Sequence, residues 1–164
     1  MTCITHWDAP LGRLLLASDG ENLIGLWLEG QKHYGAGLDD AAVTEDSLPV
    51  FAETKRWMSA YFAGEQPSAG ELPLKPAGSE FGCRIWQLLR EIPYGEVTTY
   101  GQLAKEYEAR FGRKTSARAV GGAVGRNPIS ILVPCHRVVG ADGTLTGYAG
   151  GMAAKQYLLQ LEQT

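Results

Sequence analysis

The stretch Ile131-Leu-Val-Pro-Cys-His-Arg-Val-Val139 places a cysteine, a histidine and an arginine between two apolar segments. Apolar runs of this length predict a buried strand or a core turn. The polar break is expected to bring the thiol of Cys135 to the edge of the core, with two potential cations beside it. Because nearby positive charge favours the nucleophilic thiolate, the stretch predicts an activated cysteine. The alternative is a free cysteine that serves only as a small buried hydrophobic residue.

Further motifs flank this stretch in a fixed order. They are Arg118-Ala-Val-Gly-Gly122, Asn127-Pro128, Gly147-Tyr-Ala-Gly-Gly151 and Lys155. Together with Pro134-Cys-His-Arg-Val138, this order resembles the active-site region of the O6-alkylguanine-DNA alkyltransferases from Phe81 to Glu162. The residues before Phe81 resemble that family only loosely.

The composition is that of a globular chain of 164 residues, 45% of them hydrophobic, which suits one domain or two small ones. There is no apolar run long enough to span a bilayer and no signal-peptide pattern at the start. Three cysteines, far apart and without a Cys-x-x-Cys pair, favour neither a disulfide framework nor a structural zinc site. We therefore expect a cytoplasmic protein, or a nuclear one in a eukaryote, without a metal or a membrane anchor.

Charge is distributed unevenly, although the formal net charge is only −3. Residues 1–83 contain 5 Lys/Arg and 12 Asp/Glu, a balance of −7, whereas residues 84–137 contain 9 and 4, a balance of +5. Residues 138–164 carry −1. Asymmetry of this kind points to a polyanion such as nucleic acid. The alternative is a basic face that is merely solvated.

Local patterns predict the elements of the first half. Short strands are expected at residues 2–8, 12–18 and 23–28, with Asp19-Gly20 turning a hairpin between the last two. Residues 30–47 read as a loop, and 49–62 as a helix with Phe51, Trp57 and Tyr61 on one face. Residues 64–78 carry three prolines and read as a linker. We expect an N-terminal domain at residues 1–78.

The second half reads as mainly helical. Helices are expected at residues 79–90, 100–112, 116–124 and 152–162, the first two with Ser79 and Thr99 as caps. The middle pair is consistent with a helix-turn-helix. The expected fold is an α/β N-terminal domain, with a small antiparallel sheet and a ribonuclease H-like arrangement. A winged-helix-like DNA-binding domain at residues 79–164 follows it.

The helix expected at residues 116–124 has an unusually small surface. Gly121 and Gly122 each cost about 1 kcal/mol relative to Ala in a helix interior. Small side chains would admit the helix to a minor groove about 6 Å wide. Arg118 stands alone as a long side chain, and the resemblance implies that it wedges into the base stack where the target nucleotide leaves. The alternative is helix packing through the glycines, with Arg118 in solvent.

The resemblance also implies the rest of the DNA face. Its residues are Thr99, Ala119, Gly122 and Arg126, together with Tyr100. The hydroxyl of Tyr100 would reach the flipped base or an adjacent phosphate and help to protonate the leaving guanine. A tyrosine at a helix start is otherwise usually a packing residue.

The same resemblance assigns the acceptor chemistry. His136 would act as base on Cys135 through a bridging water, with Glu162 orienting the imidazole. Asn127 would be a hinge. Tyr148 and Ala149 would line the pocket, and the carbonyls of Cys135 and Val138 would receive the guanine amino group. Arg137 reads as a structural brace.

The resulting hypothesis is direct repair of O6-alkylguanine, and of O4-alkylthymine, in double-stranded DNA by a monomer. Cys135 would take the alkyl group once and irreversibly, with no cofactor. A non-enzymatic lesion-binding module is the main alternative, which the presence of Cys135 disfavours. A thiol hydrolase or redox enzyme is a weaker one, because neither a resolving cysteine nor a peptide cleft is evident.

Two departures from the family pattern are visible. The stretch from Lys105 to Ser116 is about four residues longer than in the shortest members and adds Arg110, Arg113 and Lys114 near the turn. These could strengthen contact with phosphates or simply lengthen a solvated loop. No N-terminal cluster of zinc-binding cysteines appears, so a phosphotriester-repair module is not expected.

Overall fold

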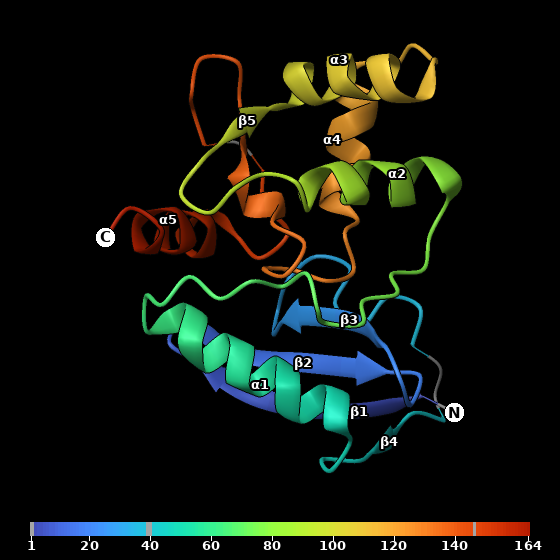
Figure 1. Cartoon of the computed structure of the whole chain (residues 1–164), viewed down its shortest axis with the longest axis vertical. Coiled ribbons are helices and arrows are strands. Elements are labelled where there is room, and N and C mark those ends of the chain that lie inside the picture. Colours follow the sequence, from blue (N-terminus) through green and yellow to red (C-terminus); the bar gives the residue numbers. More distant parts are fainter. Residues whose placement is uncertain (1, 39–40, 146) are drawn as a thin grey trace. The chain divides into compact units, whose positions relative to one another are not determined.

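A computed structural model describes residues 2–38, 41–145 and 147–164 of the chain (Figure 1). The chain divides into two compact units. The first unit comprises residues 1–77, 128–130 and 164, and the second comprises residues 78–127 and 131–163. Among the described residues, no helix is long and apolar enough to cross a membrane.

The first unit is built on a four-stranded sheet in the order β3-β2-β1-β4. Its strands are β1 (Cys3–Ala9), β2 (Gly12–Ser18), β3 (Leu23–Leu28) and β4 (Val43–Thr44). Neighbours β1, β2 and β3 pair antiparallel, and the predicted β2–β3 hairpin is confirmed. The short β4 pairs parallel with β1, so the expectation of loop throughout residues 30–47 is wrong at this point. A two-residue strand leaves too little alternation to be recognised locally.

Helix α1 (Pro49–Phe62) packs against β1 and β2, and Figure 1 shows it lying across the sheet. Its buried face includes the predicted Phe51, Trp57 and Tyr61. A separate apolar cluster forms around Leu15, Ala17 and Trp27. Gly25 makes that cluster feasible, because a Cβ at this position would lie 2.1 Å from the ring of Trp27.

Two distant segments cover the outer edge of β3. The backbone N–H of Leu23 donates to Pro73, and that of Lys75 donates to Leu23, both at 2.8 Å. The N–H of Leu26 donates to Pro128 at 2.8 Å, and Ser130 donates to Leu26 at 3.0 Å. The segment expected to be a free linker is therefore partly bonded to the sheet. An edge strand that is paired in this way offers fewer free backbone groups to other chains.

Helices α2 (Glu80–Leu89), α3 (Tyr100–Phe111) and α4 (Ala117–Gly125) pack on one another in the second unit. Each begins at a predicted cap or helix start: the hydroxyls of Ser79, Thr99 and Ser116 accept from the N–H three residues on, at 3.0–3.1 Å. Helix α3 ends at Gly112, whose φ of 71° is the left-handed conformation that favours glycine. The indole of Trp86 donates to the carbonyl of Ala123 at 2.9 Å and ties α2 to α4. The predicted helical second domain is thus present, with α3 and α4 joined by a short turn.

The stretch that contains the cysteine forms a short 3₁₀ turn at Cys135–Arg137, followed by β6 (Val138–Val139). Strand β6 pairs parallel with β5 (Thr98–Thr99) and so places the start of α3 beside the end of the turn. Helix α5 (Met152–Leu161) follows. The approach to the turn is constrained, since Ile131 has a φ of 70°, which a β-branched residue rarely adopts.

Candidate active site

The thiol of Cys135 lies inside the second unit. Only 4% of the residue is exposed, so the expectation that the thiol would lie at the edge of the core is wrong. The 3₁₀ turn explains the difference, because it withdraws Cys135, His136 and Arg137 together into the interior. A local reading of the polar break could not show which surface would cover it.

The side chains around the sulfur come from three other segments. Burial raises the pKa of the Cys135 thiol above its ordinary value. Hydrogen bonds from the side chains of Asn127 and Tyr148, and the positive charge of Lys155, act in the opposite direction. The expectation that His136 and Arg137 would favour the thiolate is therefore wrong here, because Lys155 is the cation that does so.

Both residues after the cysteine bind instead to Glu162. The carboxylate oxygen Oε1 accepts from Nε of Arg137 at 2.8 Å and from the N–H of Gly95 at 3.2 Å. Oxygen Oε2 accepts from Nη2 of Arg137 at 3.0 Å and lies 2.6 Å from Nε2 of His136. Arg137 also donates from Nη1 to the carbonyl of Ile92 at 2.7 Å. Such bidentate, charge-assisted pairing fixes the orientation of the carboxylate.

His136 is held as a neutral imidazole with a defined orientation. It is fully buried, and this burial lowers its pKa, opposed by the bond to Glu162. Because the carboxylate accepts from Arg137, the matching tautomer of His136 carries its proton on Nε2 and donates it to Glu162. Nδ1 is then the basic nitrogen, and it has no hydrogen-bond partner among the described residues.

Lys155 is a site residue to which the sequence reasoning assigned no role. The side chain is completely buried, and Nζ donates to the carbonyl of Val138 at 2.5 Å. Burial lowers the pKa of Lys155, while the nearby Cys135 raises it. The available signal was its helical spacing, since Lys155 and Leu158 of α5 and Glu162 at its C-cap recur at intervals of three and four residues and are all buried. Two charged residues on the buried face of a helix imply partners inside the core.

The other predicted pocket residues lie close to the thiol in sequence or by contact. Asn127 is buried and donates from Nδ2 to the carbonyl of Val133 at 2.8 Å, which holds the approach to the turn. The carbonyl of Val138 accepts from Lys155, and that of Cys135 accepts from the N–H of Val138. Ala149 is half-buried next to Tyr148.

The predicted DNA-contact residues lie on or next to α3 and α4 of the same unit. Tyr100 is the first residue of α3 and is half-buried; a Cβ on Gly121 would lie 3.7 Å from its ring. Arg118, Ala119 and Gly122 are exposed on α4. The exposed Arg126 follows the helix, and Thr99 caps α3. Within the described ranges, no hydrogen bond or ion pair joins Tyr100, Arg118 or Arg126 to the cluster around Cys135.

The basic residues of the second unit separate into two groups. Arg84 pairs with Glu80, and Arg110 forms a bidentate pair with Glu91 at 2.5 and 2.8 Å. Arg110 is thus paired with Glu91 and does not add an unpaired positive charge near the turn. In the described part of the chain, the other exposed basic residues of this unit make no ion pair: Arg90, Lys105, Arg113, Lys114, Arg118 and Arg126. The same part of the chain contains no group of three or more His, Cys, Asp or Glu residues arranged to hold a metal ion.

Comparison with known families accounts for nearly the whole chain. The model of the DNA binding domain of 6-O-methylguanine DNA methyltransferase matches residues 80–164. The model of the ribonuclease-like domain of the same family matches residues 4–76.

Individual relatives match over similar lengths. A methylated-DNA--protein-cysteine methyltransferase of Haemophilus influenzae is 46% identical over 97% of this chain and 85% of its own. One from Methanosarcina acetivorans is 45% identical over 95% of each chain. The crystal structure of Mycobacterium tuberculosis OGT in complex with DNA superimposes with a TM-score of 0.84 and 40% identity, covering 98% of this chain and 92% of that one.

Proposed function

The chain belongs to the 6-O-methylguanine DNA methyltransferase family, and on that premise we propose that it repairs O6-alkylguanine in DNA by transferring the alkyl group to Cys135. O4-alkylthymine is a second expected substrate. The single observation that best supports this assignment is a buried thiol that Asn127 and Tyr148 hydrogen-bond and that the charge of Lys155 favours as thiolate. His136, on the same turn, pairs with Glu162.

Cys135 starts as a neutral thiol, because burial raises its pKa. Nδ1 of His136 takes the thiol proton through a water, and Glu162 stabilises the imidazolium that results. Lys155 stabilises the thiolate as it forms. The sulfur then attacks the alkyl carbon, a C–S bond forms, and the bond from that carbon to O6 breaks. Guanine departs with the electron pair and receives a proton from Tyr100.

The reaction ends with a neutral thioether on the protein, and there is no evident route back. Each molecule therefore acts once. No cofactor enters this scheme, because the alkyl group moves directly between two atoms that the protein and the substrate supply. We infer a monomer that acts in the cytoplasm, or in the nucleus if the source is eukaryotic.

The lesion must leave the duplex before the buried thiol can reach it. Insertion of Arg118 into the base stack from the exposed face of α4 would fill the space left by the flipped nucleotide. The glycine and alanine surface around it would allow the helix to approach the minor groove closely. Tyr100 at the start of α3 and Arg126 beyond α4 would hold the backbone on either side.

Intact mass measured after mixing with an O6-methylguanine duplex tests the assignment. We expect a gain of about one methylene of mass, which peptide mapping places on Cys135. Cys135→Ala should abolish the gain while still binding the lesion, and Cys83→Ala, which removes the half-buried thiol, should retain it. Tight binding by the native protein without any change of mass would instead indicate a lesion-binding module.

A further inference from the structure

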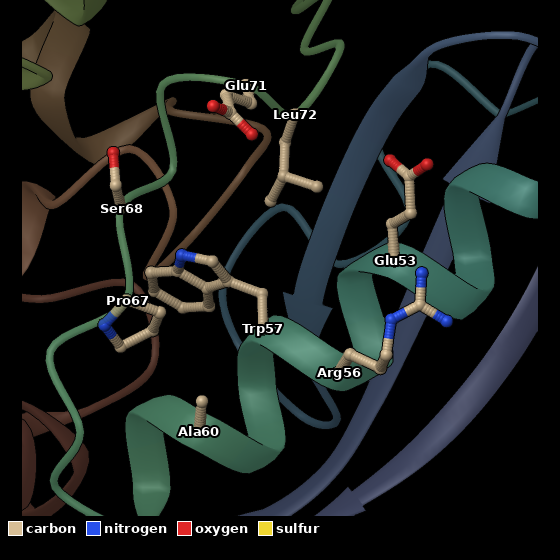
Figure 2. Close-up of a pocket in the computed structure, with 8 residues that line it drawn as sticks. All are labelled: Glu53, Arg56, Trp57, Ala60, Pro67, Ser68, Glu71 and Leu72. Atoms are coloured by element: carbon tan, nitrogen blue, oxygen red, sulfur yellow. The ribbon is translucent and has the colours of Figure 1, made fainter.

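The first unit contains a pocket of about 490 Å³ that shares no residue with the candidate active site. Figure 2 shows helix α1 on one side of it and the chain that follows α1 on the other. The lining residues are Glu53, Arg56, Trp57, Ala60, Pro67, Ser68, Glu71 and Leu72. Nothing in the proposed alkyl transfer uses them.

Trp57 gives the pocket a specific chemical requirement. The residue is nine-tenths buried, and its ring stacks on Tyr61 with centroids 5.0 Å apart. Its indole nitrogen is buried and has no hydrogen-bond partner among the described residues. In Figure 2 the nitrogen-bearing edge is directed toward the segment that carries Ser68, Glu71 and Leu72. A buried donor without an acceptor is unfavourable, so a ligand that supplies one gains affinity there.

The charged residues of the pocket define a second requirement. Glu53, Arg56 and Glu71 are all exposed, and none of them forms an ion pair in the described part of the chain. The lining therefore carries a formal net charge of −1, within a segment, residues 1–83, whose balance is −7. Trp57, Pro67 and Leu72 contribute the apolar surface. The complementary ligand combines a cation, an apolar body and a hydrogen-bond acceptor.

We propose that this pocket binds an extended, proline-containing basic segment of a partner protein. A backbone carbonyl of the segment accepts from the indole of Trp57, proline rings pack on Trp57 and Pro67, and an arginine side chain pairs with Glu53 or Glu71. Segments in the polyproline conformation fit this description, because their carbonyls are not used internally and their backbone is already extended. Such binding is independent of alkyl transfer.

Titration of the ¹⁵N-labelled full-length protein with a short blocked polyproline peptide tests this site. Arginine at every third position places the cations on one side of the three-residue repeat. We expect the indole N–H resonance of Trp57 to move, while those of the other three tryptophans, which lie outside the pocket, stay in place. Peptides with glutamate or with serine in place of arginine are the matched controls, and both should bind more weakly.

Single substitutions measure how much the indole donor and each carboxylate contribute to the affinity for the peptide. Trp57→Phe retains the ring but removes the donor and should weaken binding about fivefold to tenfold. Glu53→Gln and Glu71→Gln should each weaken it about twofold to fivefold and reduce its salt dependence. Glu21→Gln, an equal change of charge at an exposed residue outside the lining, should have no effect.

Three results would overturn the assignment. They are an unmoved Trp57 resonance at saturating peptide, equal binding of the glutamate peptide, and binding that is indifferent to both carboxylate variants. The exposed carboxylates make the last result decisive even if Trp57→Phe disturbs the packing on Tyr61. Transfer of a methyl group to Cys135 should be unchanged in Glu53→Gln and Glu71→Gln, so failure here leaves the repair assignment intact.

Discussion

Around Cys135 the charged side chains are buried and bonded, whereas along α4 they stand in solvent without a partner. Arg137, His136 and Glu162 form one connected group, and Lys155 bonds to a carbonyl beside it. Arg118 on α4 and Arg126 after it are exposed and make no ion pair in the described part of the chain. The two regions belong to the same unit but meet opposite physical demands.

This difference teaches what each region is adapted to do. Buried charges must be compensated within the fold, so they are rigid, and removal of one partner leaves another uncompensated. Exposed charges contribute little to folding but remain available to an external polyanion. Substitutions in the first region should therefore act on stability and chemistry, and those in the second on DNA binding alone.

Replacing Glu162 with Gln should have the largest effect. The change leaves the guanidinium of Arg137 buried without a countercharge and removes the partner of His136. We expect the free energy of unfolding to fall by about 3–5 kcal/mol, measured by urea denaturation. Glu91→Gln, which breaks the exposed pair with Arg110, should lower it by less than about 1 kcal/mol. Similar losses in the two variants would show that burial does not distinguish these pairs.

Arg118→Ala should impair the exposed region without affecting the buried one. Base flipping requires a few kcal/mol, so loss of the wedge should slow repair in duplex DNA by about one to two decades. Reaction with free O6-benzylguanine, which needs no flipping, should keep its rate. Arg90→Ala, at another exposed arginine of the second unit, is the control. Equal slowing on both substrates would assign Arg118 to the chemistry or the fold.

Lys155→Met should affect the chemistry by way of the thiol. The substitution keeps an unbranched stem in the core but removes the charge that lowers the pKa of Cys135. A higher thiol pKa leaves less thiolate at neutral pH, so transfer from free O6-benzylguanine should slow about tenfold. Because the pKa rises, the pH at which the rate increases should also rise. Lys105→Met, at an exposed lysine, is the control. If the pH profile of Lys155→Met has the same midpoint as that of the control, Lys155 contributes only to packing.

The smallest effect should come from reversing Arg113 and Lys114 to Glu. The native protein should bind undamaged duplex weakly, and binding should loosen as salt rises. For every phosphate that is no longer neutralised, the slope of log K against log salt should fall by about 0.9. All sequences should be affected alike, and the free base should react normally. The double variant Lys32→Glu with Lys75→Glu in the first unit is the control and should leave the slope unchanged. If the Arg113 and Lys114 reversal also leaves it unchanged, the turn is only a solvated loop.

The sequence predicted most accurately the helix ends and turns, which depend on residues only a few positions apart. Ser79 and Thr99 begin helices as expected, and Gly112 ends one, because a cap acts within a single turn. The hairpin at Asp19 follows from the same kind of signal: its carboxylate accepts from the N–H groups of Glu21 and Asn22. The helix-turn-helix followed from two such signals in succession.

What sequence could not predict depends on partners distant in the chain. The contact of Lys155 with Val138 spans 17 residues, and the contact of His136 with Glu162 spans 26. The resemblance supplied the pairing of His136 with Glu162. Only the fold reveals that Arg137 binds the same carboxylate, so that Lys155 is the cation whose charge acts on Cys135. The pairing of Pro128 with Leu26 is equally non-local, and no pattern around either residue announces it.

Burial of Cys135 also bears on how long an unused molecule remains competent. A protein that reacts once must keep its sulfur reduced until it meets damage. Peroxides attack thiolates that are accessible, and oxidation beyond the sulfenic acid is largely irreversible. The Cys135 thiol is only 4% exposed, so peroxide reaches it poorly, and burial raises its pKa, so little of it is thiolate. The half-buried Cys83 should record oxidative exposure first, and so serve as an internal indicator of how far a preparation has aged.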